Sequence, residues 1–296
     1  MAEFLNFYLI PGIVLGSIYA LGAIGITLTF GILRFANFAH GEIMTLGVYF
    51  AWSLVQMTGM HPLAAMPISM ILTVGVTLGM DRMFFKPLRD APVVMLVVAS
   101  FGLMLMVRSV IQFSWGVQLK TVLPGIQMPY IFADFLRIAP KHIMIIAGAV
   151  VLMGAVHYLL NYTRIGKAMR AMSDSPELAR LTGIDTERVV KATWIVGAAL
   201  ACAAGVFLAI DTHVETRMGF KLLLPMFAAA ILGGVGKPYG ALAGGLIIGI
   251  AEELSAYPWI GTTPLLNPGY KAGVAFTIMI GMLIWRPSGL FRGRVF

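Results

Sequence analysis

Residues 164–191 read RIGKAMRAMSDSPELARLTGIDTERVVK, and they interrupt a chain that is otherwise strongly apolar. Six of the 21 Lys and Arg residues and four of the 13 Asp and Glu residues fall within this stretch. Over the whole chain, 59% of the residues are hydrophobic and 11% are charged, whereas soluble domains have about 45–50% apolar and about 25% charged residues. The contrast predicts a membrane protein with one long charged segment outside the bilayer.

Apolar runs recur on both sides of this segment, and a helix needs about 20 such residues to cross a bilayer. We expect spans over residues 8–33, 37–57, 62–81, 92–113, 142–161 and 192–210, a Gly-rich stretch over 222–254 and a last span over 271–285. The fold class is therefore all-α, a polytopic transmembrane helical bundle of about eight to nine spans. With no long soluble stretch, residues 1–296 are expected to form a single domain.

The Gly-rich stretch reads ILGGVGKPYGALAGG at its centre, over residues 231–245. Proline interrupts a helix, so Lys237-Pro238 predicts two short helices that meet at a turn. One long tilted span is the alternative. Because irregular backbone is tolerated at membrane depth only inside protein or beside a wet cavity, the turn is a candidate for the translocation pathway, with unpaired backbone groups at Gly233, Gly234 and Gly236.

Basic residues gather in three places, and the side of a membrane that carries most Lys and Arg is usually cytoplasmic. The first cluster is Arg82, Lys86 and Arg89, the second lies within 164–191, and the third is Arg286, Arg292 and Arg294. We therefore expect all three in the cytoplasm, together with the C-terminus. The number of spans then places the N-terminus on the outside.

The charged segment contains signals for two short helices. Ser175 is a typical N-cap, Pro176 suits the first helical position, and Glu177 is an acid in the first turn. Gly183 suits the position just after the helix end. The preceding residues 164–172 are expected to form another short helix, with Ala168, Ala171 and Met172 on one side.

This segment has more structure than a connector needs. Leu178 and Leu181 give the second helix an apolar edge, and either Asp185 or Thr186 is expected to cap the next span. Capped helices with an apolar edge and exposed charge favour docking against a soluble partner. An amphipathic segment that lies on anionic lipid is the alternative.

Polar residues between the first two apolar runs form a second candidate site. Asn37 and His40 are expected to be buried, where they can bond irregular backbone and line the pathway. For Arg34 and Glu42, a solvated turn at the membrane surface and a buried position both remain open. His40-Gly41-Glu42 matches the H-x-E of a zinc deaminase, but such a site also needs P-C-x-x-C. The chain has one cysteine, so we expect no metal site.

Charged or polar side chains near other span ends are expected to pair at the interface or to extend toward water; these are Asp81, Arg108, His157, Glu252 and Glu253. Glycines four residues apart predict close helix contacts; these are Gly12/Gly16, Gly75/Gly79, Gly236/Gly240/Gly244 and Gly245/Gly249. Neither group by itself identifies a substrate.

Three segments, residues 20–52, 164–184 and 224–253, resemble the signature regions of the branched-chain amino acid ABC transporter permease family, in particular its LivH-like subunits. They read ALGAIGITLTFGILRFANFAHGEIMTLGVYFAW, RIGKAMRAMSDSPELARLTGI and LPMFAAAILGGVGKPYGALAGGLIIGIAEE. The resemblance implies that residues 163–191 are the cytoplasmic coupling segment that seats in a cleft of an ATPase subunit. The positions that match the family pattern are Gly166, Ala168, Arg170, Ala171, Ala179, Leu181, Gly183 and Ile184. With the helix-start residues Ser175 to Leu178, they form the expected coupling site.

The resemblance further implies a permease subunit in a bacterial inner membrane that imports branched-chain amino acids or related small amino acids or amides. Its implied partners are a second permease of the LivM-like type, two ATP-binding subunits and a periplasmic solute-binding protein received by loops 114–141 and 255–270. The chain has no G-x-x-x-x-G-K-[ST] motif and no catalytic constellation, so we expect no enzyme activity and no cofactor, with ATP and Mg bound by the partner ATPases. An ion-coupled secondary transporter is the alternative, but we find neither paired broken helices nor a mid-membrane acid.

Overall fold

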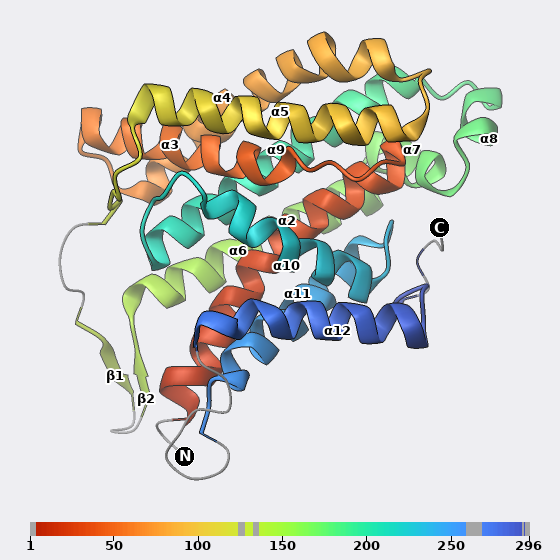
Figure 1. The fold of residues 1–296 in the computed structure, drawn as a ribbon. Helices are drawn as coiled ribbons and strands as arrows, with labels where there is room; N and C mark the ends of the chain where they lie inside the picture. The colour runs from red at the N-terminus through yellow and green to blue at the C-terminus, as the bar shows by residue number, and fades with distance from the viewer. Residues whose placement is uncertain (1–3, 124–127, 133–135, 259–267, 292, 294–296) are drawn as a thin grey trace.

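The computed structural model describes residues 4–123, 128–132, 136–258, 268–291 and 293. Nine helices of 15 or more residues make up the bundle in this described part of the chain (Figure 1). They are α2 (Ile10–Leu33), α3 (His40–Thr58), α4 (Pro62–Met80), α5 (Val93–Trp115), α6 (Pro140–Tyr162), α9 (Thr186–Asp211), α10 (Met218–Gly233), α11 (Pro238–Ser255) and α12 (Lys271–Trp285). The all-α bundle expected from the sequence is confirmed.

Shorter elements join these helices. A π-helical turn, η1 (Leu5–Leu9), runs into α2, and η2 (Asp81–Phe85) with the 3-10 turn η3 (Lys86–Leu88) extends α4. The charged segment forms α7 (Arg164–Asp174) and α8 (Pro176–Leu181), while η4 (Pro268–Tyr270) precedes α12. Strands β1 (Tyr130–Phe132) and β2 (Leu136–Ile138) form an antiparallel pair with Tyr130 opposite Ile138. This pair was not anticipated, because its stability comes from backbone pairing within an expected loop.

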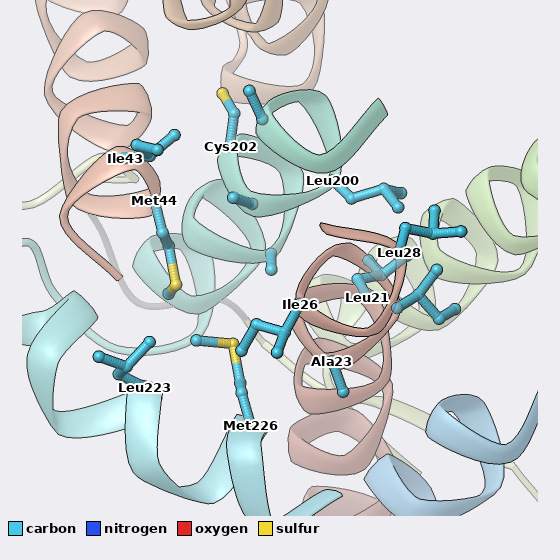
Figure 2. Packing of buried hydrophobic residues seen from close by; sticks show 14 of the residues in the cluster. Leu21, Ala23, Ile26, Leu28, Ile43, Met44, Leu200, Cys202, Leu223 and Met226 are labelled. Carbon is cyan, nitrogen blue, oxygen red and sulfur yellow. The ribbon is translucent and has the colours of Figure 1, made fainter. Parts of the chain in front are cut away.

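Five helical segments in the described residues are long and apolar enough to cross a membrane: Leu5–Leu33, Pro62–Leu88, Val93–Trp115, Pro140–Tyr162 and Thr186–Asp211. Of the most apolar stretch in each, 72% is buried in the first and 83% in the last, but only 22% in Pro140–Tyr162. Helices α2 and α9 therefore form the centre of the bundle, and α6 lies at its edge. In Figure 2, Ile26 of α2, Met44 of α3 and Met226 of α10 come together in this apolar core.

The predicted interruption of the Gly-rich stretch is confirmed. Helix α10 ends at Gly233 and α11 begins at Pro238, with Lys237 in an extended conformation between them. A proline at the first position of α11 needs no backbone donor and has a backbone angle suited to the helix. The alternative of one long tilted span is therefore wrong.

Small residues bring α2 and α11 into backbone contact. A Cβ atom added at Gly16 would lie 2.9 Å from the Cα of Leu246, and one added at Gly249 would overlap the backbone of Gly16. In contrast, a Cβ added at Gly75 or Gly79 would have no neighbour within 4 Å. Equal spacing in the sequence thus predicts the contact correctly for Gly12/Gly16 and Gly245/Gly249, and wrongly for the pair on α4.

The first two basic clusters and Arg286 of the third lie at one end of the bundle, which we call the basic end (Figure 1). Lys86 forms a 2.6 Å ion pair with Glu187 at the start of α9, which joins the first cluster to the charged segment. The segment after Arg286 returns to α10, where the Leu290 amide donates to the Leu232 carbonyl over 2.9 Å. Arg292 and Arg294 lie outside the described residues. The strands β1 and β2 lie at the opposite end.

Candidate functional site: the basic end and the buried polar groups

Side-chain caps define the helices of the charged segment. Thr163 accepts a hydrogen bond from the Gly166 amide over 3.1 Å at the start of α7. Ser175 ends α7 and caps α8, where it accepts from the Leu178 amide over 3.5 Å. Asp185, rather than Thr186, caps α9 by accepting from the Arg188 amide over 3.1 Å. Short polar side chains at these positions satisfy amides that have no partner inside the helix.

Helix α7 packs on the bundle through a face centred on Met169. Gly166, Met169 and Met172 are buried, and a Cβ added at Gly166 would overlap the backbone carbonyl of Leu159. Ala168 and Ala171 are only half-buried. Of the three residues expected on one side of this helix, Met172 is therefore part of the buried face, whereas Ala168 and Ala171 lie at its edge, because the close contact at Gly166 sets the rotation of the helix.

Helix α8 presents its apolar edge outward. Leu178 is 63% exposed and Leu181 is 83% exposed, whereas Ala179 is buried. Glu177 is exposed beside them and Ile184 is half-buried. Gly183 has φ = +80°, as expected for the residue after a helix end. The second short helix thus has the predicted apolar edge.

A chain of polar side chains joins α7 to two spans. Arg170 donates to Asn161 Oδ1 over 3.2 Å, and Asn161 Nδ2 donates to the Tyr239 hydroxyl over 2.6 Å. The Tyr239 hydroxyl is also 2.8 Å from His157 Nδ1. The residues come from α7, α6 and the first turn of α11. Arg170 was predicted from the sequence as a coupling residue, but Asn161 and Tyr239 were not. In the sequence, these two residues differ from their surroundings only as polar side chains near the end of a span.

The turn between α10 and α11 lies at the basic end. Gly234 and Gly236 have φ of +105° and +84°. Gly236 faces α2 and α7, since a Cβ there would be 4.0 Å from the Gly31 Cα and 3.7 Å from Ser173 Oγ. The Gly233 carbonyl accepts from the Phe291 amide over 3.2 Å. The expectation of unpaired backbone groups is therefore wrong at Gly233, because the segment after α12 supplies a donor. It is also wrong at Gly234, whose amide donates to the Ala230 carbonyl over 3.0 Å and whose carbonyl accepts from the Lys237 amide over 3.1 Å.

Residues 34–39 run as irregular backbone between α2 and α3. Asn37 and His40 are 3% and 1% exposed, which confirms their predicted burial. Asn37 Oδ1 accepts from the Ala39 amide over 3.1 Å, so Asn37 bonds irregular backbone as expected. The expected span over 37–57 begins as a helix only at His40.

Ser100 of α5 stabilises this irregular segment from the side. Its hydroxyl accepts from the Phe38 amide over 3.2 Å. Its single proton lies between two acceptors, the Val97 carbonyl of its own helix at 2.7 Å and the Ala36 carbonyl at 3.3 Å. Ser100 thereby satisfies a backbone amide that no helix satisfies, as the membrane interior requires.

The structure does not bring together the two groups of residues expected to line the pathway, Asn37 with His40 and the Gly233–Gly236 turn. The ring of His40 packs against Gly25, because a Cβ added at Gly25 would lie 2.8 Å from it. The Gly233–Gly236 turn instead reaches Gly31. Gly25 and Gly31 are six residues apart on α2, which corresponds to about 9 Å along the helix. His40 thus lies deeper in the bundle than the glycine turn.

Glu42 lies in the first turn of α3 with a fully buried side chain. Arg108 of α5 donates to its Oε1 from Nε over 2.9 Å and from Nη2 over 2.5 Å. The guanidinium also lies over the Phe220 ring of α10, 4.8 Å from the ring centre. Arg34, by contrast, is exposed and has φ = +60°. The solvated alternative is therefore wrong for Glu42, and so is the expectation that no acid lies within the membrane-spanning part. The sequence could not pair Glu42 with a residue 66 positions away.

The remaining polar groups near span ends are also paired. Asp81 accepts two bonds from Arg89 Nη2, of 2.9 and 2.7 Å. Glu253 forms a 2.7 Å ion pair with Lys271. The Tyr19 hydroxyl donates to Glu252 over 2.7 Å inside the α2–α11 contact. Pairing, rather than extension toward water, accounts for these residues as well as for Arg108 and His157.

Comparisons with known proteins agree over nearly the whole chain. Residues 8–283 match the family described as branched-chain amino acid transport system / permease component. The chain is 30% identical to the high-affinity branched-chain amino acid transport system permease protein BraD of Pseudomonas aeruginosa, over 95% of this chain and 94% of that one. It is 31% identical to the LivH protein of Escherichia coli K12, over 94% and 92% of the two chains. It is 33% identical to a probable LivH protein of Methanocaldococcus jannaschii, over 94% and 90%.

Among solved structures, the fold is similar to PsaBC from Streptococcus pneumoniae in complex with Fab, with a TM-score of 0.51. The similarity covers 97% of this chain and 93% of that one at 11% identity, so it concerns the fold alone. The family match and the relatives at 30% identity and above extend over the helices that position both candidate sites. The chain therefore belongs to the branched-chain amino acid transport system permease component family.

Proposed function

We propose that this permease forms half of the translocation pathway of an ATP-driven importer for branched-chain or related small amino acids. The observation that carries the proposal is the pair of capped helices α7 and α8, which we call the coupling helices. They present Leu178 and Leu181 outward at the basic end. An exposed apolar edge framed by charged residues suits a groove on a soluble partner, here an ATPase subunit.

The basic end is proposed to face the cytoplasm, because the first two Lys and Arg clusters and Arg286 lie there and such clusters are rarely translocated. The C-terminus would then be cytoplasmic and the N-terminus periplasmic, in a bacterial inner membrane. ATP and Mg would be bound by two ATPase subunits at the basic end, with no cofactor in this chain.

The end with β1 and β2 would face a periplasmic solute-binding protein. The segments that follow α5 and α9 pair there, because the backbones of Lys120 and Val214 exchange hydrogen bonds of 3.0 and 2.7 Å. The Lys120 ammonium also lies 3.8 Å from the centre of the Trp52 ring. A receiving surface built on such fixed loops would keep its shape when the binding protein docks.

A second permease, of the LivM-like type, would complete the pathway. Helix α5 carries many exposed apolar side chains, among them Val94, Phe101 and Phe113. Such a surface can be covered by lipid or by another membrane helix. The pathway would then lie between the two permeases rather than within this chain.

Coupling requires that movement at the ATPase reaches the spans through elements that keep their shape. Helix α7 is joined to α6 through Thr163 and through Arg170 with Asn161. It is joined to α11 through Tyr239 and lies near α2 at Ser173 and Gly31. A displacement of the coupling helices would therefore be passed to three spans at once.

The proposal is tested by replacing Leu181 with Ala in the complete transporter. Loss of a central apolar anchor typically weakens an interface by about 2–4 kcal/mol, so we expect the ATPase to be lost on co-purification and ATP-driven uptake to cease. Leu181→Met is the matched control, because it conserves volume and should retain both. Full ATPase association in Leu181→Ala, or uptake driven by an ion gradient without ATPases, would contradict the proposal.

A further inference from the structure

The Glu42–Arg108 pair lies inside the membrane-spanning part of the chain. Arg108 is seven residues before the end of α5 at Trp115, which places its backbone about 10 Å from that end. The side chain does not extend toward water but turns to Glu42 and Phe220. Charged groups at such depth are energetically unfavourable and usually face protein or a water-filled route rather than lipid.

Glu42 occupies only part of the hydrogen-bonding capacity of Arg108. A guanidinium has five N–H donors, and both bonds to Glu42 go to the same oxygen, from Nε and Nη2. No bond from Nη1 to another described residue is present. The arrangement also has a direction, because the Arg108 side chain is 17% exposed and that of Glu42 is not exposed at all. The cation is therefore partly exposed, and its counter-ion is fully buried beneath it.

Apolar side chains share the helix faces that carry this partly exposed cation. Phe101 and Leu105 of α5 are 47% and 46% exposed, and Phe220 of α10 is 39% exposed. Phe38, from the irregular segment, contacts both Phe101 and Phe227, with ring centres 6.3 and 5.7 Å apart. We call this surface, formed by Phe38, Phe101, Leu105, Arg108, Phe220 and Phe227, the α5–α10 face. It combines one cation with an apolar, aromatic lining.

We propose that Arg108 binds the carboxylate of the amino acid cargo as it passes along the α5–α10 face, with Glu42 as the positioning residue that holds the guanidinium. This inference rests on the proposed function. An α-amino acid with an apolar side chain has the two properties that the face matches: a carboxylate for the guanidinium and a hydrocarbon part for Phe101, Leu105 and Phe220. Amides and urea lack the carboxylate, so the site favours amino acids as the cargo class.

Glu42 makes this contact transient. An unpaired guanidinium at low dielectric would hold a carboxylate strongly, and a strongly held cargo would not leave. The carboxylate of Glu42 offsets most of the positive charge, while the N–H donors that do not bond to Glu42 remain available. The pair therefore provides hydrogen-bond donors without a large net charge.

A purely structural ion pair would behave differently when both partners are replaced. Removing one partner leaves an uncompensated buried charge, whereas replacing both by neutral isosteres is often tolerated. The double variant Arg108→Gln with Glu42→Gln therefore separates the two roles. A structural pair predicts that the double variant recovers function lost in the single variants, while a cargo contact predicts that it does not.

The experiment uses the complete transporter, with both permeases, both ATPases and the binding protein, reconstituted in proteoliposomes. The readout is the ratio of leucine imported to ATP hydrolysed at saturating binding protein. We expect R108Q/E42Q to lower this ratio about tenfold or more, as for loss of a charge-assisted hydrogen bond. The matched control is Tyr19→Phe with Glu252→Gln, which removes another buried polar pair away from the face and should retain the wild-type ratio.

A wild-type ratio in R108Q/E42Q, or an equal loss in the control pair, would overturn the inference. If R108Q/E42Q does not assemble, Arg108→Lys is measured instead, because a lysine keeps the charge but not the planar set of donors. A fall of about threefold or more in Arg108→Lys supports the inference, and an unchanged ratio overturns it. Failure of the wild-type complex to import leucine would instead contradict the proposed function, so the two failures are distinct.

Discussion

Arg170 on α7 and Asn161 at the end of α6 are joined by a hydrogen bond of 3.2 Å between Nη1 and Oδ1. The bond spans the sharp turn at Thr163, where the direction of the chain changes. Asn161 donates a hydrogen bond to the Tyr239 hydroxyl, which also bonds to His157. Arg170 of the coupling helices is therefore connected to both α6 and α11 through side chains. Backbone continuity alone would connect α7 only to α6.

Removing the Tyr239 hydroxyl is expected to weaken this connection. Tyr239→Phe should lower leucine uptake per ATP about fivefold, which corresponds to one hydrogen bond of about 1 kcal/mol. The measurement is uptake and ATP hydrolysis in proteoliposomes. Tyr158→Phe is the control, since Tyr158 is 64% exposed and stacks on Tyr162. Equal ratios in the two variants would argue against a role of the polar chain in coupling.

The α2–α11 contact is expected to reject any large side chain. In Gly249→Leu the new atoms would meet the Gly16 backbone, and overpacking of this kind typically costs about 1–3 kcal/mol or more. We expect a clearly lower Tm in detergent and a poor yield of assembled transporter. Gly75→Leu, whose site has no neighbour within 4 Å, should leave the Tm unchanged or raise it. A similar loss in both would mean that glycine flexibility, not close contact, matters.

Gly183 isolates the effect of backbone conformation from that of packing. Its φ is +80°, yet a Cβ there would meet nothing within 4 Å. Gly183→Val should therefore act only through strain, of about 1–2 kcal/mol, and should reduce ATPase co-purification by displacing α8. Gly183→Asn tolerates the left-handed region and should preserve association. Loss in both variants, or in neither, would contradict this account.

Orientation can be tested with single cysteines, because Cys202 is the only native one. It is fully buried, and Cys202→Ala provides the background. In intact cells we expect an impermeant thiol reagent to label Met128→Cys and to leave Arg180→Cys unlabelled until the membrane is permeabilised. Both positions are exposed, and they lie near β1 and on α8. Labelling of Arg180→Cys from outside would reverse the proposed orientation.

Local signals in the sequence were sufficient to predict where α8 begins and where the Gly-rich stretch is interrupted. Ser175-Pro176 fixed the start of α8, and Lys237-Pro238 fixed the break before α11, because capping and the missing proline N–H act within a few residues. The start of α3 was predicted at residue 37, whereas the helix begins at His40. Its irregular backbone depends on Ser100, which is 62 residues from Phe38.

Contacts between distant segments could not be predicted from the sequence, because they depend on which helices face each other in the folded bundle. The spacing of Gly75/Gly79 equals that of Gly12/Gly16, and only the presence of a facing helix separates them. Arg108 could be assigned to a span end, but its partner Glu42 is supplied by the packing of α3 against α5. The candidate coupling residues were predictable because they form a continuous segment, whereas the α5–α10 face is assembled from three separate ones.

The Tyr19–Glu252 bond joins residues 233 positions apart, and it lies within the close contact between α2 and α11. At about 5–20 residues per second, a ribosome needs about ten to fifty seconds to make the intervening chain. During that interval α2 is already in the bilayer, with the bare backbone at Gly12 and Gly16 and a tyrosine hydroxyl not yet matched to α11. The α2–α11 contact can therefore form only late in synthesis, when α12 is the one long helix of the described chain still to be made. An interrupted nascent chain thus exposes the surface that a membrane chaperone or protease would recognise as unfinished.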